Sequence, residues 1–438
     1  MRTFLLRGSF LASAVLQCGS ETPTISAAIP AAVSSSASSS VGTGTGGGDA
    51  FVVAAGGTEE GPVDASTFDG RACAGTELDA KLLPSNLLFV IDVSSSMGCN
   101  LPPIQTTASC EQKPEKLQKT APSKWETVKP QLKTAIAKLP SLSPNWGAGV
   151  VYFPAKSDVG GIENRCAVTN APHVPVAVVD AMQLEKINKS LDEVKTEGWT
   201  PAIGALWSAY DYMHATLKSP GNDFVIFVTD GTPKPECHDQ VSDPKSAAEE
   251  FEEDKAYFLD KVLGMADQAG IHTFVIGVPG SEGAREFLST VAKRGKTALN
   301  ADCVCSGKYC ADHASASADA GNCHFDMTDS QLDLAGALSD AFAKIATKTI
   351  SCNLDVPTAV GKEVDYSLVN VTFTPSTGAT ESIPQDNSKA CNDANGWQYN
   401  ANKTHILLCG AACEKVKADI KGQLKVVLGC QTTTNTPQ

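Results

Sequence analysis

The stretch FVIDVSSSMG at residues 89–98 runs from apolar residues into an acid, three serines and a glycine. The overlapping run LLFVID at residues 87–92 is short and apolar up to its last residue, which is typical of a strand buried on both faces of a parallel sheet. Asp92, Ser94 and Ser96 follow at alternating positions, so their side chains can all face one point beyond the end of the strand. The stretch therefore predicts a cluster of oxygen atoms at the edge of a buried sheet.

Strands and helices alternate along the chain around this stretch. Further apolar runs predict buried strands at residues 147–154, 223–231 and 271–280. Apolar residues at helical spacing predict helices at residues 124–139, 182–195, 201–217, 245–270, 282–295 and 331–348. This order predicts an α/β fold over residues 85–348, a doubly wound and mostly parallel sheet with helices on both faces. Ligands of such folds bind outside the carboxyl ends of the strands.

The pattern changes after Thr349. Residues 363–375 alternate as a strand does, residues 405–410 and 423–430 are further strand candidates, and no strong helix is predicted. The same region is rich in cysteine. It is therefore predicted to form a small disulfide-rich β domain over residues 350–438.

Two more oxygen donors occur at matching places in the predicted sheet. Thr200 lies in GWTPAIGAL, in the turn before a helix, and Asp230 lies at the carboxyl end of the run FVIFVTDG. Taken alone, Ser94 and Ser96 would be ordinary helix caps. Together with Thr200 and Asp230 they favour a metal site, because hydroxyl and carboxylate oxygens suit Mg²⁺ or a similar hard cation and do not suit zinc.

These five positions strongly resemble the metal-ion-dependent adhesion site of von Willebrand factor type A domains. That site consists of an Asp-x-Ser-x-Ser sequence, a threonine after a glycine-rich turn and a later aspartate, and all five occur here in that order. The resemblance covers about residues 85–348 and implies the same α/β fold. Several short sequence stretches, including SMGCN, GVVYFP and TFVIGVPG, resemble those of a group of bacterial secreted or surface lipoproteins.

The resemblance implies a site for Mg²⁺, or for Mn²⁺ or Ca²⁺, in which Ser94, Ser96 and Thr200 are direct ligands. Asp92 and Asp230 would bind the ion directly or through water. Mg²⁺ keeps several of its waters in proteins, and the carboxylate of an Asp or Glu on a partner protein can displace one of them. The chain is thus expected to be a divalent-cation-dependent protein-binding or adhesion module on the bacterial envelope, and not an enzyme.

Two other functions remain open at this point. An envelope scaffold would use the metal only to stabilise its fold. A metal-assisted hydrolase would use the ion to activate water. The hydrolase is disfavoured because no nucleophile triad accompanies the five residues, and His214 and His272 lie in mid-helix and at the start of a strand.

Composition limits the class of protein further. The chain has 438 residues, of which 42% are hydrophobic and 19% charged, as in soluble globular proteins. Its net charge is −14 and no basic stripe is visible, so binding to nucleic acid is disfavoured. Its 15 cysteines favour disulfides in an oxidising compartment.

The N-terminus indicates export. Residues 1–18 have the layout of a signal peptide, with two arginines before a short apolar stretch. Cys18 stands where a bacterial lipoprotein carries its lipid, although Gln17 replaces a small residue, and cleavage after the small residues 12–14 is the alternative. Residues 19–72 are predicted to be a disordered Ser/Gly-rich tether. The expected location is the outer membrane, cell surface or periplasm as a lipoprotein, or otherwise the medium, with membrane contact only through this anchor.

Disulfide connectivity cannot be derived from the sequence. The pairs expected from position are Cys99–Cys110, Cys166–Cys237 and Cys352–Cys430. Residues 303–326 hold four cysteines and two histidines, which could form two local disulfides or a zinc site, and export favours the disulfides.

Three residues beside the predicted site have open roles. Trp199 precedes Thr200 and is expected either to anchor a partner or to pack beneath the metal loop. Glu236 and His238 could line the rim, although solvated loop residues are the plainer expectation.

Overall fold

Strand β4 (Ser85–Asp92) lies inside a six-stranded sheet in the computed structural model. The strand order is β6-β5-β4-β7-β8-β9, and all pairs are parallel except that between β5 and the edge strand β6. The other strands of this sheet are β5 (Gly147–Phe153), β6 (Val174–Val178), β7 (Asn222–Thr229), β8 (Ile271–Gly277) and β9 (Phe325–Asp326). The predicted fold class, a doubly wound and mostly parallel sheet, is confirmed.

The structure describes residues 67–68, 71–72, 76–142, 146–155, 165–217, 222–237, 244–305, 321–356, 364–391, 393–419 and 421–434. The predicted signal peptide, Cys18 and most of the predicted tether lie outside these ranges, as do His238 and part of the cysteine-rich segment. Within them, no helix is both long enough and apolar enough to span a membrane.

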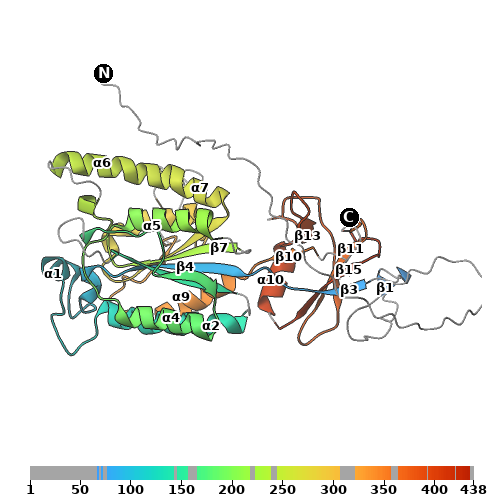
Figure 1. Ribbon diagram of the computed structural model, residues 1–438, viewed down its shortest axis with the longest axis horizontal. Helices are drawn as coiled ribbons and strands as arrows, with labels where there is room; N and C mark the ends of the chain where they lie inside the picture. The colour runs from blue at the N-terminus through green and yellow to red at the C-terminus, as the bar shows by residue number, and fades with distance from the viewer. Residues whose placement is uncertain are drawn as a thin grey trace, which may run out of the picture. The chain divides into compact units, whose positions relative to one another are not determined.

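Helices cover both faces of the sheet, and β4 is therefore buried on both faces (Figure 1). Its residues Leu87, Phe89 and Ile91 pack into one core with helices α2 (Lys124–Leu142), α4 (Ala181–Glu193) and α9 (Leu334–Lys348). Leu88 and Val90 pack into a second core on the opposite face. The helices of that face are α5 (Ala202–Asp211), α7 (Leu263–Gln268) and α8 (Arg285–Arg294).

Shorter helical segments connect these elements. Helix α6 (Pro244–Tyr257) continues through η4 (Phe258–Val262) into α7, where a single helix was predicted. The remaining segments are η1 (Ser95–Gly98), α1 (Thr107–Gln112), η2 (Tyr212–Thr216), η3 (Pro235–Cys237) and η5 (Glu282–Ala284).

The strand order places a crevice at the carboxyl end of β4. Strand β5, the next strand along the chain, pairs with one side of β4, and strand β7 pairs with its other side. The strand order therefore reverses direction at β4. Crevices at such a reversal of strand order are the usual ligand sites of open α/β sheets. Asp92 ends β4 and Asp230 directly follows β7, so both lie at this point.

The C-terminal region forms two antiparallel sheets around its own core. One has the order β10-β14-β13 and the other the order β12-β11-β15-β3. The strands of this region are β10 (Asn353–Asp355), β11 (Val369–Thr374), β12 (Glu381–Ile383), β13 (Gly396–Tyr399), β14 (His405–Cys409) and β15 (Gln423–Leu428). The region also holds several disulfides, as predicted.

Two features of this region differ from the sequence-based expectation. Helix α10 (Gly410–Ala418) follows β14 directly, where no strong helix was predicted. Strand β3 (Thr76–Ala80), which precedes the α/β fold in the chain, pairs antiparallel with β15. Residues from both sides of the α/β fold therefore build one sheet. A further short hairpin joins β1 (Thr67–Phe68) to β2 (Arg71–Ala72).

The disulfides confirm part of the expected pairing. Cys99–Cys110 and Cys166–Cys237 form as predicted. The expected pair Cys352–Cys430 is wrong, because Cys352, the residue before β10, pairs instead with Cys413 of α10. The remaining described pairs are Cys303–Cys323 and Cys391–Cys409, and Cys305 and Cys430 are also disulfide-bonded. The thiols of Cys303 and Cys323 are therefore not available to zinc.

Candidate metal centre

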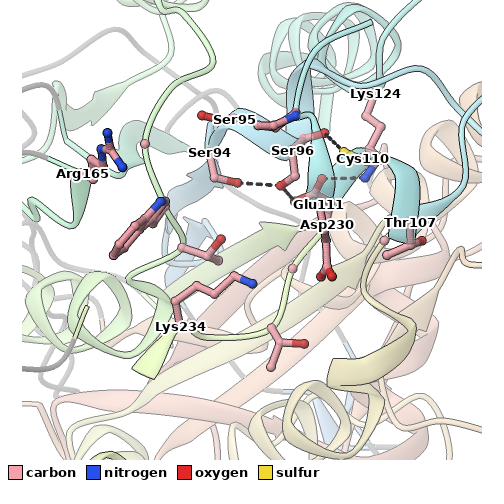
Figure 2. Close-up of a pocket in the computed structure, with 17 residues that line it drawn as sticks. Ser94, Ser95, Ser96, Thr107, Cys110, Glu111, Lys124, Arg165, Asp230 and Lys234 are labelled. Carbon is pink, nitrogen blue, oxygen red and sulfur yellow. Dashed lines mark hydrogen bonds and ion pairs between the residues drawn. The ribbon is translucent and has the colours of Figure 1, made fainter. Parts of the chain in front are cut away.

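A chain of hydrogen bonds joins three of the predicted site residues at the carboxyl edge of the sheet (Figure 2). Ser94 Oγ lies 3.0 Å from Ser96 Oγ. Ser96 Oγ in turn donates to Asp230 Oδ1 at 2.8 Å. The loop after β4 and the turn after β7 thus bring their oxygen atoms together, as the alternating serines predicted.

Asp92 lies beneath this group and is fully buried. Its Oδ1 accepts a hydrogen bond from the backbone N–H of Ser94 at 2.8 Å, and its Oδ2 accepts one from Thr229 Oγ1 at 2.5 Å. Burial, followed by the nearby charge of Asp230, raises the pKa of Asp92 to about 7. Two carboxylates in so dry a place repel each other, and a cation between them would stabilise both.

A cavity of about 460 Å³ opens above Asp92, and Ser94, Ser96, Thr200 and Asp230 all line it. Thr200 approaches closely because residue 231 is a glycine. A Cβ at Gly231 would lie 3.3 Å from Thr200 Oγ1, so a larger residue would crowd the two loops. The structure therefore brings four of the five predicted residues to one cavity, and the fifth, Asp92, is buried and hydrogen-bonded to the backbone of Ser94.

The ammonium group of Lys124 also lies in this site, and the sequence analysis missed it. Lys124 Nζ is 2.7 Å from Asp230 Oδ2, and the two side chains are 4% and 0% exposed. Figure 2 shows the lysine reaching the aspartate from the opposite side to Ser96. A lysine at the start of an amphipathic helix is normally solvated, so the sequence pattern does not point to this contact.

A capping box at the start of α2 fixes the position of Lys124. The backbone N–H of Glu126 donates to Ser123 Oγ at 3.1 Å, and the backbone N–H of Ser123 donates to Glu126 Oε2 at 2.7 Å. A cation in the first helical turn is unfavourable beside the positive end of the helix dipole. Asp230 compensates for this, which is why a lysine can be buried there.

Removing the cap should loosen this arrangement. Ser123→Ala is expected to lower the free energy of unfolding by about 1 kcal/mol, as other N-cap replacements do. Urea denaturation measures the loss. Ser141→Ala is the matched control, since Ser141 Oγ is an exposed donor near the other end of the same helix. Equal effects of the two substitutions would contradict the role of the capping box.

The walls of the cavity are covalently braced and carry charged groups. The pair Cys99–Cys110 closes the insertion that follows the serines, and Cys110 lines the cavity. On the other wall, the guanidinium of Arg165 lies 5.6 Å from the ring centroid of Trp199, and both residues line the cavity together with Lys234. Trp199 is half-buried and in contact with the cavity, so it is available to a bound partner.

The donor set fits a hard cation. It combines hydroxyl and carboxylate oxygens, which Mg²⁺, Mn²⁺ and Ca²⁺ prefer. Among the described residues, no group of three or more His, Cys, Asp or Glu side chains is placed to hold a metal. Of the described residues that line the cavity, none is a histidine.

No protein-family model matches the chain, and no curated protein matches it. Among solved structures, the chain is similar to the pilus adhesin SpaC from Lactobacillus rhamnosus GG, with 12% identity and a TM-score of 0.38 over 80% of this chain. It is also similar to a mutant of the PilB minor pilin from Streptococcus sanguinis, with 12% identity and a TM-score of 0.38 over 61% of this chain. A third is a von Willebrand factor type A protein from Catenulispora acidiphila, with 12% identity and a TM-score of 0.32 over 83% of this chain.

The chain spans 39%, 61% and 61% of the length of these three proteins. The identities and TM-scores are too low to carry an argument about function. The α/β fold is established by the strand order and by the two buried faces of β4.

Proposed function

We propose that this protein is a divalent-cation-dependent protein-binding module of the adhesion type, with Mg²⁺ or Mn²⁺ as its cation. The observation that carries the proposal is the convergence of Ser94, Ser96, Thr200 and Asp230 on one cavity above the buried Asp92. The resemblance of these five residues to a metal-ion-dependent adhesion site supports it.

Each residue has a distinct part in this proposal. Ser94, Ser96 and Thr200 would hold the cation through neutral oxygens, and Asp92 and Asp230 would supply the balancing charge. When bound, the cation would supply an open coordination position for an Asp or Glu carboxylate of a partner. Asp92 accepts the backbone N–H of Ser94 and so fixes the loop that presents both serines. Arg165 and Lys234 at the cavity wall favour the approach of an anionic side chain.

The proposed location follows from the disulfides and the N-terminal sequence. Disulfide pairs form and persist in oxidising compartments, which fits an exported protein. We place the module on the cell envelope, tethered through residues 19–72 and a lipid on Cys18, and we assign it no enzymatic activity.

Two alternative functions would give different experimental results. A scaffold would gain thermal stability from Mg²⁺ but bind no envelope ligand, and a hydrolase would cleave an ester or peptide library and lose that activity in Asp230→Ala.

Calorimetric titration of Mg²⁺ and Mn²⁺ into the full chain tests the metal site. Wild type is expected to bind one ion. Ser96→Ala and Thr200→Val should each weaken binding at least tenfold, about the loss seen when groups supporting a metal ligand are removed. Thr107→Val is the matched control, because Thr107 lines the same cavity but donates its hydroxyl to Glu282. Binding that is equally strong in all four proteins would place the ion elsewhere and overturn the proposal.

A further inference from the structure

The ammonium group of Lys124 places a positive charge inside a site that is proposed to hold a cation. Lys124 Nζ lies 2.7 Å from Asp230 Oδ2 within a buried pair. We propose that Lys124 is a tethered cation that holds Asp230 in the metal-free site and competes with a divalent ion for that carboxylate. This inference rests on the proposed function and assigns a regulating residue to the same site.

Both oxygens of Asp230 are already in use. Oδ1 accepts the hydroxyl of Ser96, and Oδ2 accepts the ammonium of Lys124. A divalent ion that takes either oxygen therefore replaces one of these contacts or shares the carboxylate with Lys124. Sharing places two positive groups side by side in a buried site, where salt screens their repulsion far less than at the surface.

The structure contains a built pocket for the ammonium group. Gly280 has a φ of +117°, a conformation that suits glycine. A Cβ at this position would lie 2.6 Å from Lys124 Nζ and 2.6 Å from the backbone oxygen of Asp230. The absence of a side chain at Gly280 thus leaves the space in which Lys124 and Asp230 meet.

Lys124 is also held at its backbone. Its N–H donates to the carbonyl oxygen of Cys99 at 2.9 Å, one residue beyond the end of η1, which carries Ser96. The capping box at Ser123 fixes the same turn of helix. The ammonium is therefore part of the site's framework, keeping it assembled without metal and lowering its affinity for free ions.

Substitution of Lys124 by methionine tests this inference, because methionine keeps much of the side-chain length without the charge. In calorimetric titrations of the full chain with Mg²⁺, Lys124→Met is expected to bind at least about tenfold more tightly than wild type, since buried like charges no longer compete. The rise in melting temperature on adding Mg²⁺ should grow in parallel. Lys129→Met is the matched control, because Lys129 lies on the same helix and pairs with the exposed Asp192 at 3.5 Å.

The outcomes separate this inference from the proposed function. Tighter binding by Lys124→Met, with Lys129→Met equal to wild type, supports the competition, including when wild type binds too weakly to measure. Equal or weaker binding by Lys124→Met overturns the competition and leaves the metal site standing. Absence of Mg²⁺ binding in folded wild type and folded Lys124→Met overturns both. If Lys124→Met does not fold, Lys124→Gln, which keeps a donor for Asp230, is judged by the same criteria.

Discussion

Asp230→Ala is expected to lower the free energy of unfolding of the metal-free protein by about 3–5 kcal/mol, the usual cost of removing one partner from a buried ion pair. The cost arises because the ammonium of Lys124 is left buried without its carboxylate partner. The side chain of Lys124 is 4% exposed, and Asp230 is the one carboxylate with which it forms an ion pair among the described residues. The double variant Asp230→Ala with Lys124→Met removes both charges. It should recover most of the loss, to within about 1–2 kcal/mol of wild type, because apolar replacement of a buried pair is often nearly neutral.

Urea denaturation in EDTA of wild type, both single variants and the double variant gives the coupling energy directly. Asp192→Ala is the matched control, since Asp192 pairs with Lys133 at 2.6 Å on the surface and is 56% exposed. It should cost less than about 1 kcal/mol. Losses that simply add in the double variant would contradict the pairing of Lys124 with Asp230.

The second large effect is expected from His324, which is buried beside α8. Its Nδ1 lies 2.9 Å from Ser289 Oγ, and only 2% of the residue is exposed. Burial is the main reason that the pKa of His324 is lowered to about 4. The negative charge of Asp326 opposes this shift, and the positive charge of Arg285 adds to it. In the unfolded chain the pKa is about 6.5. Between these values the unfolded state binds more protons, so stability falls as the pH is lowered.

The loss approaches about 3 kcal/mol when the pH falls from above 6.5 to about 4. Denaturation of wild type and His324→Gln in EDTA across this range measures it, and the difference between the two curves removes the titration of groups common to both. The difference in stability should shrink steadily as the pH falls through this window. A difference that stays constant from pH 7 to pH 4 would show that His324 is not held neutral by the fold.

The sheet could be predicted from sequence because its central strands are buried on both faces. Runs such as LLFVID are apolar throughout, and few other structures explain such runs between amphipathic helices. The site followed from the same pattern, since Asp92 ends β4, Asp230 directly follows β7, and the fold places these two strands side by side. Hydroxyls at alternating positions after β4 completed the prediction.

The elements that the sequence analysis missed depend on distant partners. Strand β6 is an exposed edge whose residues mostly face solvent, and strand β3 is polar and gains its place by pairing with β15. Helix α10 is short, and a disulfide from Cys413 to Cys352 fastens it. None of these contacts leaves a local pattern in the chain.

Lys124 was missed for a related reason. A lysine at the start of an amphipathic helix is normally solvated. Its burial depends on Asp230, which lies 106 residues further along the chain, and on the space left by Gly280. A local signal was nevertheless present, because Ser123 and Glu126 have the spacing of a capping box and fix where Lys124 stands.

The most direct test of the account is a crystal structure of the full chain grown with Mn²⁺, with an anomalous difference map. The account predicts one strong peak in the cavity, bonded to Ser94 Oγ, Ser96 Oγ and Thr200 Oγ1, with the Lys124–Asp230 contact lengthened. A cavity without a peak at saturating Mn²⁺, with Lys124 still 2.7 Å from Asp230 as it is here, would contradict the central claim.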